Sequence, residues 1–427
     1  MQSEDLMMDI GWAPIVSQAQ AARTADRQAL ARHLLAARER TVALFSASCM
    51  ALGDPPVVPH SPELNPPLWE LGHIGWFADW WIARNPQRGL GVRADPQALR
   101  TPARQARRGL DTDALYDSSR VAHTSRWQLP LPDTASTTED LAASLSDTLA
   151  LLSQAPDTDD GLYFFRLALF HEDMHAEAAV YMAQTLGHDP FAGGALPHPP
   201  MRPIADPAAS ETLTVPAGDW RMGHQAPGFA FDNELGVHTL HVPAFQIDAT
   251  PVTWGRYLPF IEAGGYEQAR WWSEAGWAWR CAQQRKVPRY LRRIDTQEWE
   301  RQRWGLWEPL DLNDAACHLS AFEAEAWCAW AGRRLPSEAE WAFATQTAPG
   351  FQWGHVWEWT ATPFAPFRGF APHPYVDYSV PWFDGRPVLK GASSATHPRM
   401  RHLAYRNYFE PQRNDVMAGF RSAGKPH

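Results

Sequence analysis

The stretch LALFHEDMHAEAAVYM, from Leu167 to Met182, is the part of this chain that says most about its fold. Apolar residues recur in it at helical spacing, so it predicts a helix with a broad buried face. His171 and His175 stand four residues apart, which on a helix places both imidazoles on one face, one turn apart. Two imidazoles in that arrangement can share one metal ion. The stretch therefore predicts half of a metal site on a buried helix.

A third histidine offers the missing ligand. His73 lies in LWELGHIGWF, within a second segment of helical character and with aliphatic and aromatic residues on either side. Facing helices of a bundle can point ligands at one interior site. Three histidines leave coordination positions open, which is typical of a catalytic metal site rather than a closed structural one. From residue types alone zinc is the expected metal, because the common iron pattern includes a carboxylate.

Two other interpretations of the histidine pair stay open. The pair could consist of ordinary core histidines that satisfy hydrogen bonds. The spacing H-E-x-x-H also occurs in zinc peptidases, where Glu172 would be the general base and a third ligand would come from a downstream cleft residue. The chain lacks the H-x-x-G-x-x-H continuation and has no downstream E-x-x-x-D/E helix, so the context disfavours a zinc hydrolase.

Composition narrows the class of protein. The chain has 427 residues, 45% hydrophobic and 20% charged, with a formal net charge of -10, which suits a globular protein of two or three domains. It has no dense block of Lys and Arg, so no nucleic acid partner is expected. The segment MQSEDLMMDIGWAPIV is acidic where a signal peptide is basic, and no apolar run reaches the roughly 18 residues of a membrane span. With four sparse cysteines, these features predict a cytoplasmic protein without a membrane partner.

The chain divides into two parts of different texture. Four segments before residue 190 have helical periodicity: 25–49, 67–85, 137–155 and 160–187. Thr137 with Asp140 resembles a capping box, and Gly187 is a plausible helix stop. We predict a helical bundle over residues 1–190 and, from its prolines and glycines, a linker over 191–211. Residues 212–427 show short β-type runs and one clear helix, SAFEAEAWCAWAG, so the predicted fold class is α+β.

A string of phrases in the second part carries a resemblance to a known family. They are VPAGDWRMG, FDNELGVHTLHVPAFQIDATPVTWGRYLPFI, LSAFEAEAWCAWAGRRLPSEAEWAFA, GHVWEWTATPF, VLKGAS and YRNYFEPQRNDVMAGFR. Residues 212–427 resemble the formylglycine-generating enzyme (sulfatase-modifying factor) fold, a C-type-lectin-like α+β domain. That fold's founding enzyme uses late cysteines, whereas no cysteine follows Cys328 here, so its activity is not implied.

The whole chain resembles the iron-dependent sulfoxide synthases of ergothioneine biosynthesis, in which a DinB-like four-helix bundle precedes this domain. The resemblance implies Fe(II) on His73, His171 and His175. It also implies hercynine, the betaine of histidine, as substrate, with a new bond made at its imidazole C2 using O2. Further residues with implied roles are Tyr375 in PYVDYS as the proton-donating catalytic tyrosine, and Tyr378, Asn407, Tyr408, Phe409 and Met174 as substrate-binding residues.

Departures from the family pattern concern the second substrate. Phe409 stands where some members have an aspartate that holds γ-glutamylcysteine, Ser394 replaces a tryptophan, and Met174 replaces a glutamine. Arg120 and Arg126 align only loosely with donor-binding arginines. Lost negative charge and added aromatic surface suit a sugar rather than an amino-acid thiol.

The sequence therefore predicts a selenoneine synthase, the branch of this family that joins hercynine to a selenosugar. An ergothioneine-type enzyme that uses γ-glutamylcysteine or cysteine is the alternative. A zinc hydrolase, or a binding module that has lost its metal, would be of a different class. The expected partners are small molecules alone: hercynine, a selenosugar or thiol, and O2.

Overall fold

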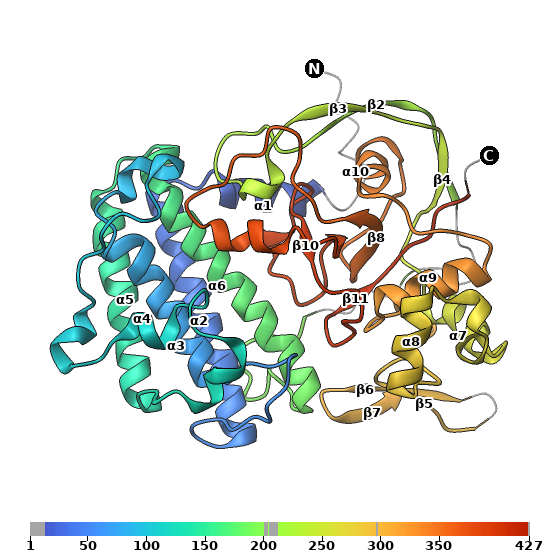
Figure 1. Ribbon diagram of the computed structural model, residues 1–427, viewed down its shortest axis with the longest axis horizontal. Helices are drawn as coiled ribbons and strands as arrows, with labels where there is room; N and C mark the ends of the chain where they lie inside the picture. The colour runs from blue at the N-terminus through green and yellow to red at the C-terminus, as the bar shows by residue number, and fades with distance from the viewer. Residues whose placement is uncertain (1–12, 200–203, 205–211, 296–297, 426–427) are drawn as a thin grey trace.

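The computed structural model describes residues 13–199, 204, 212–295 and 298–425. Every long helix of the first part ends before residue 187, and all described strands follow residue 211. Figure 1 shows these two parts side by side, with the helices α2 to α6 on the left and the strands with α7 to α10 on the right. The predicted α+β class is confirmed. Among the described residues, no helix is both long and apolar enough to cross a membrane.

All four helices predicted in the first part are present. The α-helices there are α1 Ala13–Arg23, α2 Arg27–Leu52, α3 Pro67–Ala78, α4 Thr112–Tyr116, α5 Thr134–Gln154 and α6 Asp159–Leu186. A π-helical turn, η2 Asp79–Ala83, continues α3 toward the predicted end of that segment. The 3₁₀ turns are η3 Arg88–Arg93, η4 Arg104–Arg108 and η5 His123–Gln128.

The ends of these helices follow local capping chemistry. The predicted capping box at Thr137 is wrong: α5 begins earlier, because Asp133 accepts a hydrogen bond from the backbone N–H of Ser136 at 2.8 Å. Thr137 instead lies buried inside the helix. The predicted stop at Gly187 is confirmed, since it closes α6 with φ 76°, a left-handed conformation that favours glycine.

Helix α6 is the central helix of the first part. It contacts α2, α3 and α5, and α3 packs in turn on α5. Most of its residues from Gly161 to Asp173 are buried, which the continuous apolar run of the sequence anticipates. The two halves of the metal site predicted from sequence are thereby brought into contact, because α3 carries His73 and α6 carries the histidine pair.

Helix α1 packs against the second part of the chain as well as on α2. It contacts the turn η11 Pro398–Met400. Arg23, its last residue, forms a buried bidentate ion pair with Glu234, with Nη1–Oε2 and Nη2–Oε1 distances of 2.5 and 2.8 Å. Residues before the first long helix therefore join the two parts.

The strands form four small sheets. Two of them have two strands each: β1 Thr212–Val215 pairs with β4 Phe245–Asp248, and β2 Gly218–Met222 pairs with β3 His238–Val242. A third sheet has the order β5 Leu291–Arg293, β6 Trp299–Arg303, β7 Leu306–Pro309. The fourth has four strands in the order β10 Asn407–Tyr408, β9 Pro387–Gly391, β8 Trp357–Pro363, β11 Ala418–Gly419. All strand pairs are antiparallel except β11 with β8.

Four helices accompany the sheets: α7 Trp254–Glu262, α8 Glu274–Gln283, α9 Ala321–Trp330 and α10 Glu338–Thr347. The predicted helix over SAFEAEAWCAWAG is α9, whose N-terminus is closed by a capping box between Ser320 and Glu323. The remaining 3₁₀ turns are η6 Asp232–Glu234, η7 Gly265–Glu267, η8 Ala269–Trp271, η9 Val376–Tyr378 and η10 Val380–Trp382.

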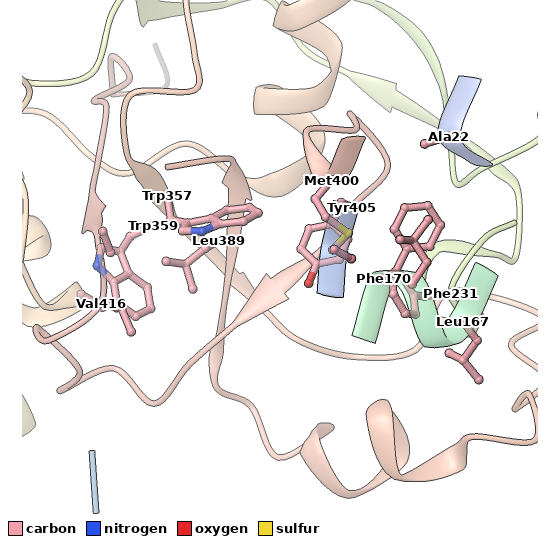
Figure 2. Packing of buried hydrophobic residues seen from close by; sticks show 14 of the residues in the cluster. Ala22, Leu167, Phe170, Phe231, Trp357, Trp359, Leu389, Met400, Tyr405 and Val416 are labelled. Carbon is pink, nitrogen blue, oxygen red and sulfur yellow. The ribbon is translucent and has the colours of Figure 1, made fainter. Parts of the chain in front are cut away.

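One hydrophobic core runs through both parts of the molecule. Its members include Leu167 and Phe170 of α6 together with Phe231, Tyr405 and other buried residues of the second part. Figure 2 shows Leu167 and Phe170 beside Phe231. Tyr405 lies between these residues and Trp357 and Leu389 of the four-stranded sheet (Figure 2). Burial of apolar surface thus holds the helix with the histidine pair directly against the second part.

Candidate metal centre

Three histidines converge where α3 crosses α6. Nε2 of His171 lies 3.3 Å from Nε2 of His73 and 3.1 Å from Nε2 of His175. Their potential ligand atoms all lie within 4.8 Å of one another, and no other such cluster occurs in the described ranges. His73 and His171 are buried, and His175 is half-buried. The structure therefore brings together the three residues that the sequence predicted as metal ligands.

Two of the imidazoles are oriented by hydrogen bonds from their other ring nitrogen. Nδ1 of His73 donates to the carbonyl oxygen of Tyr116 at 2.8 Å, and Nδ1 of His175 donates to Oε2 of Glu70. Such bonds fix the tautomer and leave Nε2 with a free lone pair. Neither partner was predicted from the sequence, although Glu70 stands three residues before His73 on the same helix, a spacing that places both on one face.

The electrostatics of the cluster favour neutral imidazoles. Burial, with the neighbouring His175, lowers the pKa of His73 to about 3 and holds that of His171 well below its usual value. Burial would raise the pKa of Glu70, but His175 outweighs it and lowers that pKa to about 2. A metal ligand must be a neutral imidazole, so two of the three need lose no proton at neutral pH.

The carboxylate of Glu70 is expected to raise the metal affinity of the site. Replacing such an outer partner typically costs 10- to 100-fold in metal affinity. We expect Glu70→Ala to weaken metal binding by about that factor, measured by titration of the metal-free protein. Glu63→Ala is the matched control, because Glu63 pairs with Arg289 instead of a histidine. Equal affinities of the two variants would contradict the role of Glu70.

Aromatic rings enclose the cluster. Phe77 stacks on His171 with ring centroids 3.5 Å apart, and Trp69 stacks on His73 at 4.8 Å. Trp76 also stacks on His73, with ring centroids 5.7 Å apart. Phe77, Trp69 and Trp76 together form the aromatic wall of the cluster. Their apolar faces limit the access of water to the site, which strengthens electrostatic interactions inside it.

The tyrosine segment of the second part lies at this aromatic wall. The ring of Tyr375 is 4.9 Å from Phe77 and 6.2 Å from His171, centroid to centroid. The ring of Tyr378 follows at 6.1 Å from Tyr375. Burial, with Asp377 nearby, raises the pKa of Tyr375, so its phenol keeps its proton at neutral pH. Tyr375 thus lies near His171 although it follows this residue by 204 positions in the chain.

The other sequence-predicted substrate residues contact aromatic rings, backbone groups and the common core. Tyr408 donates to the carbonyl oxygen of Tyr378, and the centroids of their rings are 6.0 Å apart. Asn407 is half-buried on β10, where its side-chain oxygen accepts from the backbone of Tyr408 at 2.9 Å. Phe409 faces Tyr181 of α6 at 6.4 Å, and Met174 packs on the common core.

The two arginines lie in different surroundings. Arg126 is half-buried and stacks over Trp69 at 3.9 Å, while its Nη1 donates to Asn65 at 2.8 Å. Since Trp69 stacks on His73, Arg126 lies next to the aromatic wall. Arg120 is exposed and pairs with Asp117 at 3.2 Å. The structure supports only Arg126 as a residue near the cluster.

The carboxylate of Glu172 faces away from the histidines. It accepts hydrogen bonds from Nε of Arg38 and the hydroxyl of Thr41, both at 2.8 Å, inside the contact between α2 and α6. A peptidase general base must reach a metal-bound water, whereas this carboxylate is buried in an ion pair. The arrangement therefore argues against a zinc hydrolase.

Two further acids of α6 bind the second part. Asp173 forms a fully buried bidentate pair with Arg399, with Nε–Oδ2 and Nη2–Oδ1 distances of 2.5 and 2.7 Å. Oε1 of Glu177 accepts from Nε1 of Trp357 at 2.7 Å and from the hydroxyls of Ser393 and Thr396, both at 2.9 Å. No pattern in the sequence indicates these contacts, which join the helix that carries the histidine pair to the second part.

Known proteins resemble this chain over most of its length. Residues 200–355 match the model of the sulfatase-modifying factor enzyme 1-like domain. The chain is 30% identical over 450 residues to the hercynine oxygenase of Mycolicibacterium smegmatis, across 93% of this chain and 99% of that protein. It is 32% identical to that of Mycolicibacterium thermoresistibile, with 93% and 95% covered, and 31% identical to that of Mycobacterium tuberculosis, with 92% and 98% covered.

Proposed function

Because this chain belongs to the hercynine oxygenase family, we propose that it uses oxygen and a metal held by His73, His171 and His175 to modify hercynine. The family makes it an oxygen-using enzyme that forms a carbon–sulfur bond. The observation that carries the proposal is the three-histidine cluster with the phenol of Tyr375 beside it. The active site then lies between the helical part and the strand-containing part of the chain.

The metal we assign is Fe(II). Three imidazole nitrogens suit iron as well as zinc, and two of the proposed ligands have their second nitrogen anchored by a hydrogen bond. When bound, Fe(II) supplies the one-electron and O2 chemistry that side chains lack. The protein contributes orientation through Glu70 and Tyr116, and a dry environment through Phe77 and Trp69.

Tyr375 is the proposed proton donor. Its raised pKa keeps the hydroxyl protonated, and its ring stands against the same aromatic wall as His171. A phenol placed in this way can deliver a proton during reduction of oxygen. Tyr378, Asn407, Tyr408, Phe409 and Met174 are the proposed substrate-binding residues, with Arg126 a further candidate.

The role of Tyr375 can be tested by removing one oxygen atom. General acid catalysis typically contributes a factor of about 10²–10⁴, so Tyr375→Phe is expected to lower kcat by about that factor. Hercynine affinity and iron content should change little, because the ring stays. The measurements are product formation by mass and hercynine binding by calorimetry. A Tyr375→Phe protein with full turnover would remove Tyr375 from the mechanism.

We propose further that the chalcogen donor is a selenosugar, with γ-glutamylcysteine or cysteine as the alternative. Phe409 offers no negative charge to an ammonium group, and the nearby Asp415 is already held by Arg413 at 2.6 Å. Arg413 also lies over the ring of Phe409 at 5.3 Å, which places a cation there. A neutral sugar tolerates this environment and can stack on an aromatic face.

Donor competition tests this assignment. A carboxylate at position 409 would contribute roughly 1.5–3 kcal/mol to an ammonium-bearing thiol, and its loss lowers affinity by about one to two orders of magnitude. With iron-loaded protein, hercynine and air, the selenosugar should therefore show the highest kcat/KM of the three donors. A higher value for γ-glutamylcysteine would make the chain an ergothioneine-type enzyme with a rearranged pocket.

The proposed division of the chain follows the same family. Residues 1–190 form a DinB-like four-helix bundle that carries the metal ligands, and residues 212–427 form the formylglycine-generating-enzyme-like domain. The linker over 191–211 falls largely outside the described residues. Helix α1 is assigned to the first unit by sequence position, although its Arg23 binds the second.

A further inference from the structure

One buried carboxylate binds both ends of the segment that carries Tyr375 and Tyr378. Oδ2 of Asp232 accepts a hydrogen bond from the backbone N–H of His373 at 3.2 Å. Its Oδ1 accepts a hydrogen bond from the hydroxyl of Ser379. The residues between these two points, 374–378, include both tyrosines. Asp232 thus closes the segment 373–379 into a loop.

Asp232 lies in a buried turn that contacts with other segments hold in place. It belongs to the 3₁₀ turn η6, whose last residue, Glu234, is bound by Arg23 of α1. The carbonyl oxygen of the middle residue, Asn233, accepts from Nη1 of Arg406 at 2.8 Å. Asp232, Asn233 and Glu234 are 2%, 1% and 0% exposed, so the turn has little freedom to move.

The loop is also fastened to the histidine helix. The hydroxyl of Tyr163, on α6, lies 3.0 Å from Nδ1 of His373. Tyr163 precedes His171 by eight residues on the same helix. The N-terminal end of the loop is therefore bound to the helix that carries His171. The C-terminal end, Ser379, receives a second bond from Nδ2 of Asn233 at 3.3 Å.

The segment has little structure of its own. Its regular part is the three-residue turn η9, Val376–Tyr378, and such short 3₁₀ turns are weak. Tyr375 precedes the turn with φ -84° and ψ 68°, outside the helical region. A displacement of about 1 Å at a catalytic group can cost about 10²-fold in rate, so external fixing of this segment has a direct effect on catalysis.

We propose that Asp232 is a positioning residue, whose carboxylate joins both ends of segment 373–379 and thereby sets the place of Tyr375 against His171. The proposal rests on the proposed role of Tyr375. It assigns no contact with substrate to Asp232 itself, which acts through His373 and Ser379.

The test combines a direct measure of the loop with kinetics of the iron-loaded full chain. Asp232→Ala removes both acceptors, so hydrogen exchange at the amide of His373 is expected to accelerate at least about tenfold, with kcat lower by about 10²-fold. The hercynine KM should stay within about threefold, and iron content should not change, because no ligand is touched. Asp384→Asn is the matched control, since Asp384 is an exposed acid that pairs with Arg386 farther along the same loop region.

A second pair of variants keeps the test decisive if Asp232→Ala does not fold. Ser379→Ala frees one end of the loop and should lower kcat by about tenfold, while Ser379→Thr keeps the hydroxyl and should retain most activity. Three results would each overturn the proposal. The first is unchanged hydrogen exchange at His373 in Asp232→Ala, and the second is faster exchange there with unchanged kcat. The third is equal kcat in the two Ser379 variants. Full turnover of Tyr375→Phe would instead overturn the proposed function, and exchange at His373 would still report the loop closure.

Discussion

Loss of any one of His73, His171 and His175 is expected to empty the metal site and abolish turnover. The proposed site has three histidine ligands, whose buried or half-buried Nε2 atoms lie close together. Loss of a hydrogen-bond partner of a metal ligand typically lowers metal affinity by about 10- to 100-fold. Removal of a ligand itself should therefore lower metal affinity by more than about 100-fold. His73→Ala, His171→Ala and His175→Ala should each retain less than about a tenth of an equivalent of iron after dialysis.

The measurement is iron content with circular dichroism on the same samples, which separates loss of metal from loss of fold. His241→Ala is the matched control, because this exposed histidine of β3 binds only Asp219. It should keep both its iron and its activity. If the three variants stay folded and each retains a full equivalent of iron, the metal is bound elsewhere in the chain.

The second large effect is expected at the pair Asp173–Arg399. Both side chains are nearly inaccessible, at 0% and 2% exposure, and their two hydrogen bonds join α6 to the turn η11. Arg399→Ala leaves a buried carboxylate without a partner, which typically costs about 3–5 kcal/mol of stability. We expect that loss in the free energy of unfolding of the metal-free protein, measured in urea by tryptophan fluorescence.

An exposed pair provides the comparison. Arg93 and Asp160 lie 2.8 Å apart with side chains 68% and 43% exposed, so Arg93→Ala should cost less than about 1 kcal/mol. The double variant Asp173→Leu with Arg399→Met should recover much of the stability lost in Arg399→Ala, because it leaves no unpaired charge. Similar losses for Arg93→Ala and Arg399→Ala would show that the buried pair does not stabilise the contact between the two parts.

The sequence by itself determined the features that depend on local spacing. The apolar periodicity of residues 167–182 predicted α6, and the four-residue interval placed His171 and His175 on one face of it. Gly187 predicted the end of this helix, since only glycine adopts the left-handed conformation at little cost. The α+β class and the helix α9 followed in the same way, because hydrophobic period and capping residues act within a few residues of the chain.

Tertiary structure decided everything that depends on which distant residues meet. Asp133 rather than Thr137 caps α5, and Thr137 lies buried inside the helix. Glu172, Asp173 and Glu177 look alike in sequence, yet one binds Arg38, one binds Arg399, and one accepts three hydrogen bonds from the second part. A helix turns by about 100° per residue, so neighbouring acids face different partners, and only the packed chain shows which.

The same reason explains the site. Sequence patterns could supply two ligands on one helix and His73 on a second predicted helix, and resemblance to a family could suggest Tyr375. The partners Glu70 and Tyr116, the ring of Phe77 on His171, and the closure of the tyrosine loop by Asp232 arise from contacts between separate segments. Those contacts form because one hydrophobic core spans both parts of the molecule and packs α6 against the second part. Such packing depends on many distant residues, so no single stretch of sequence predicts it.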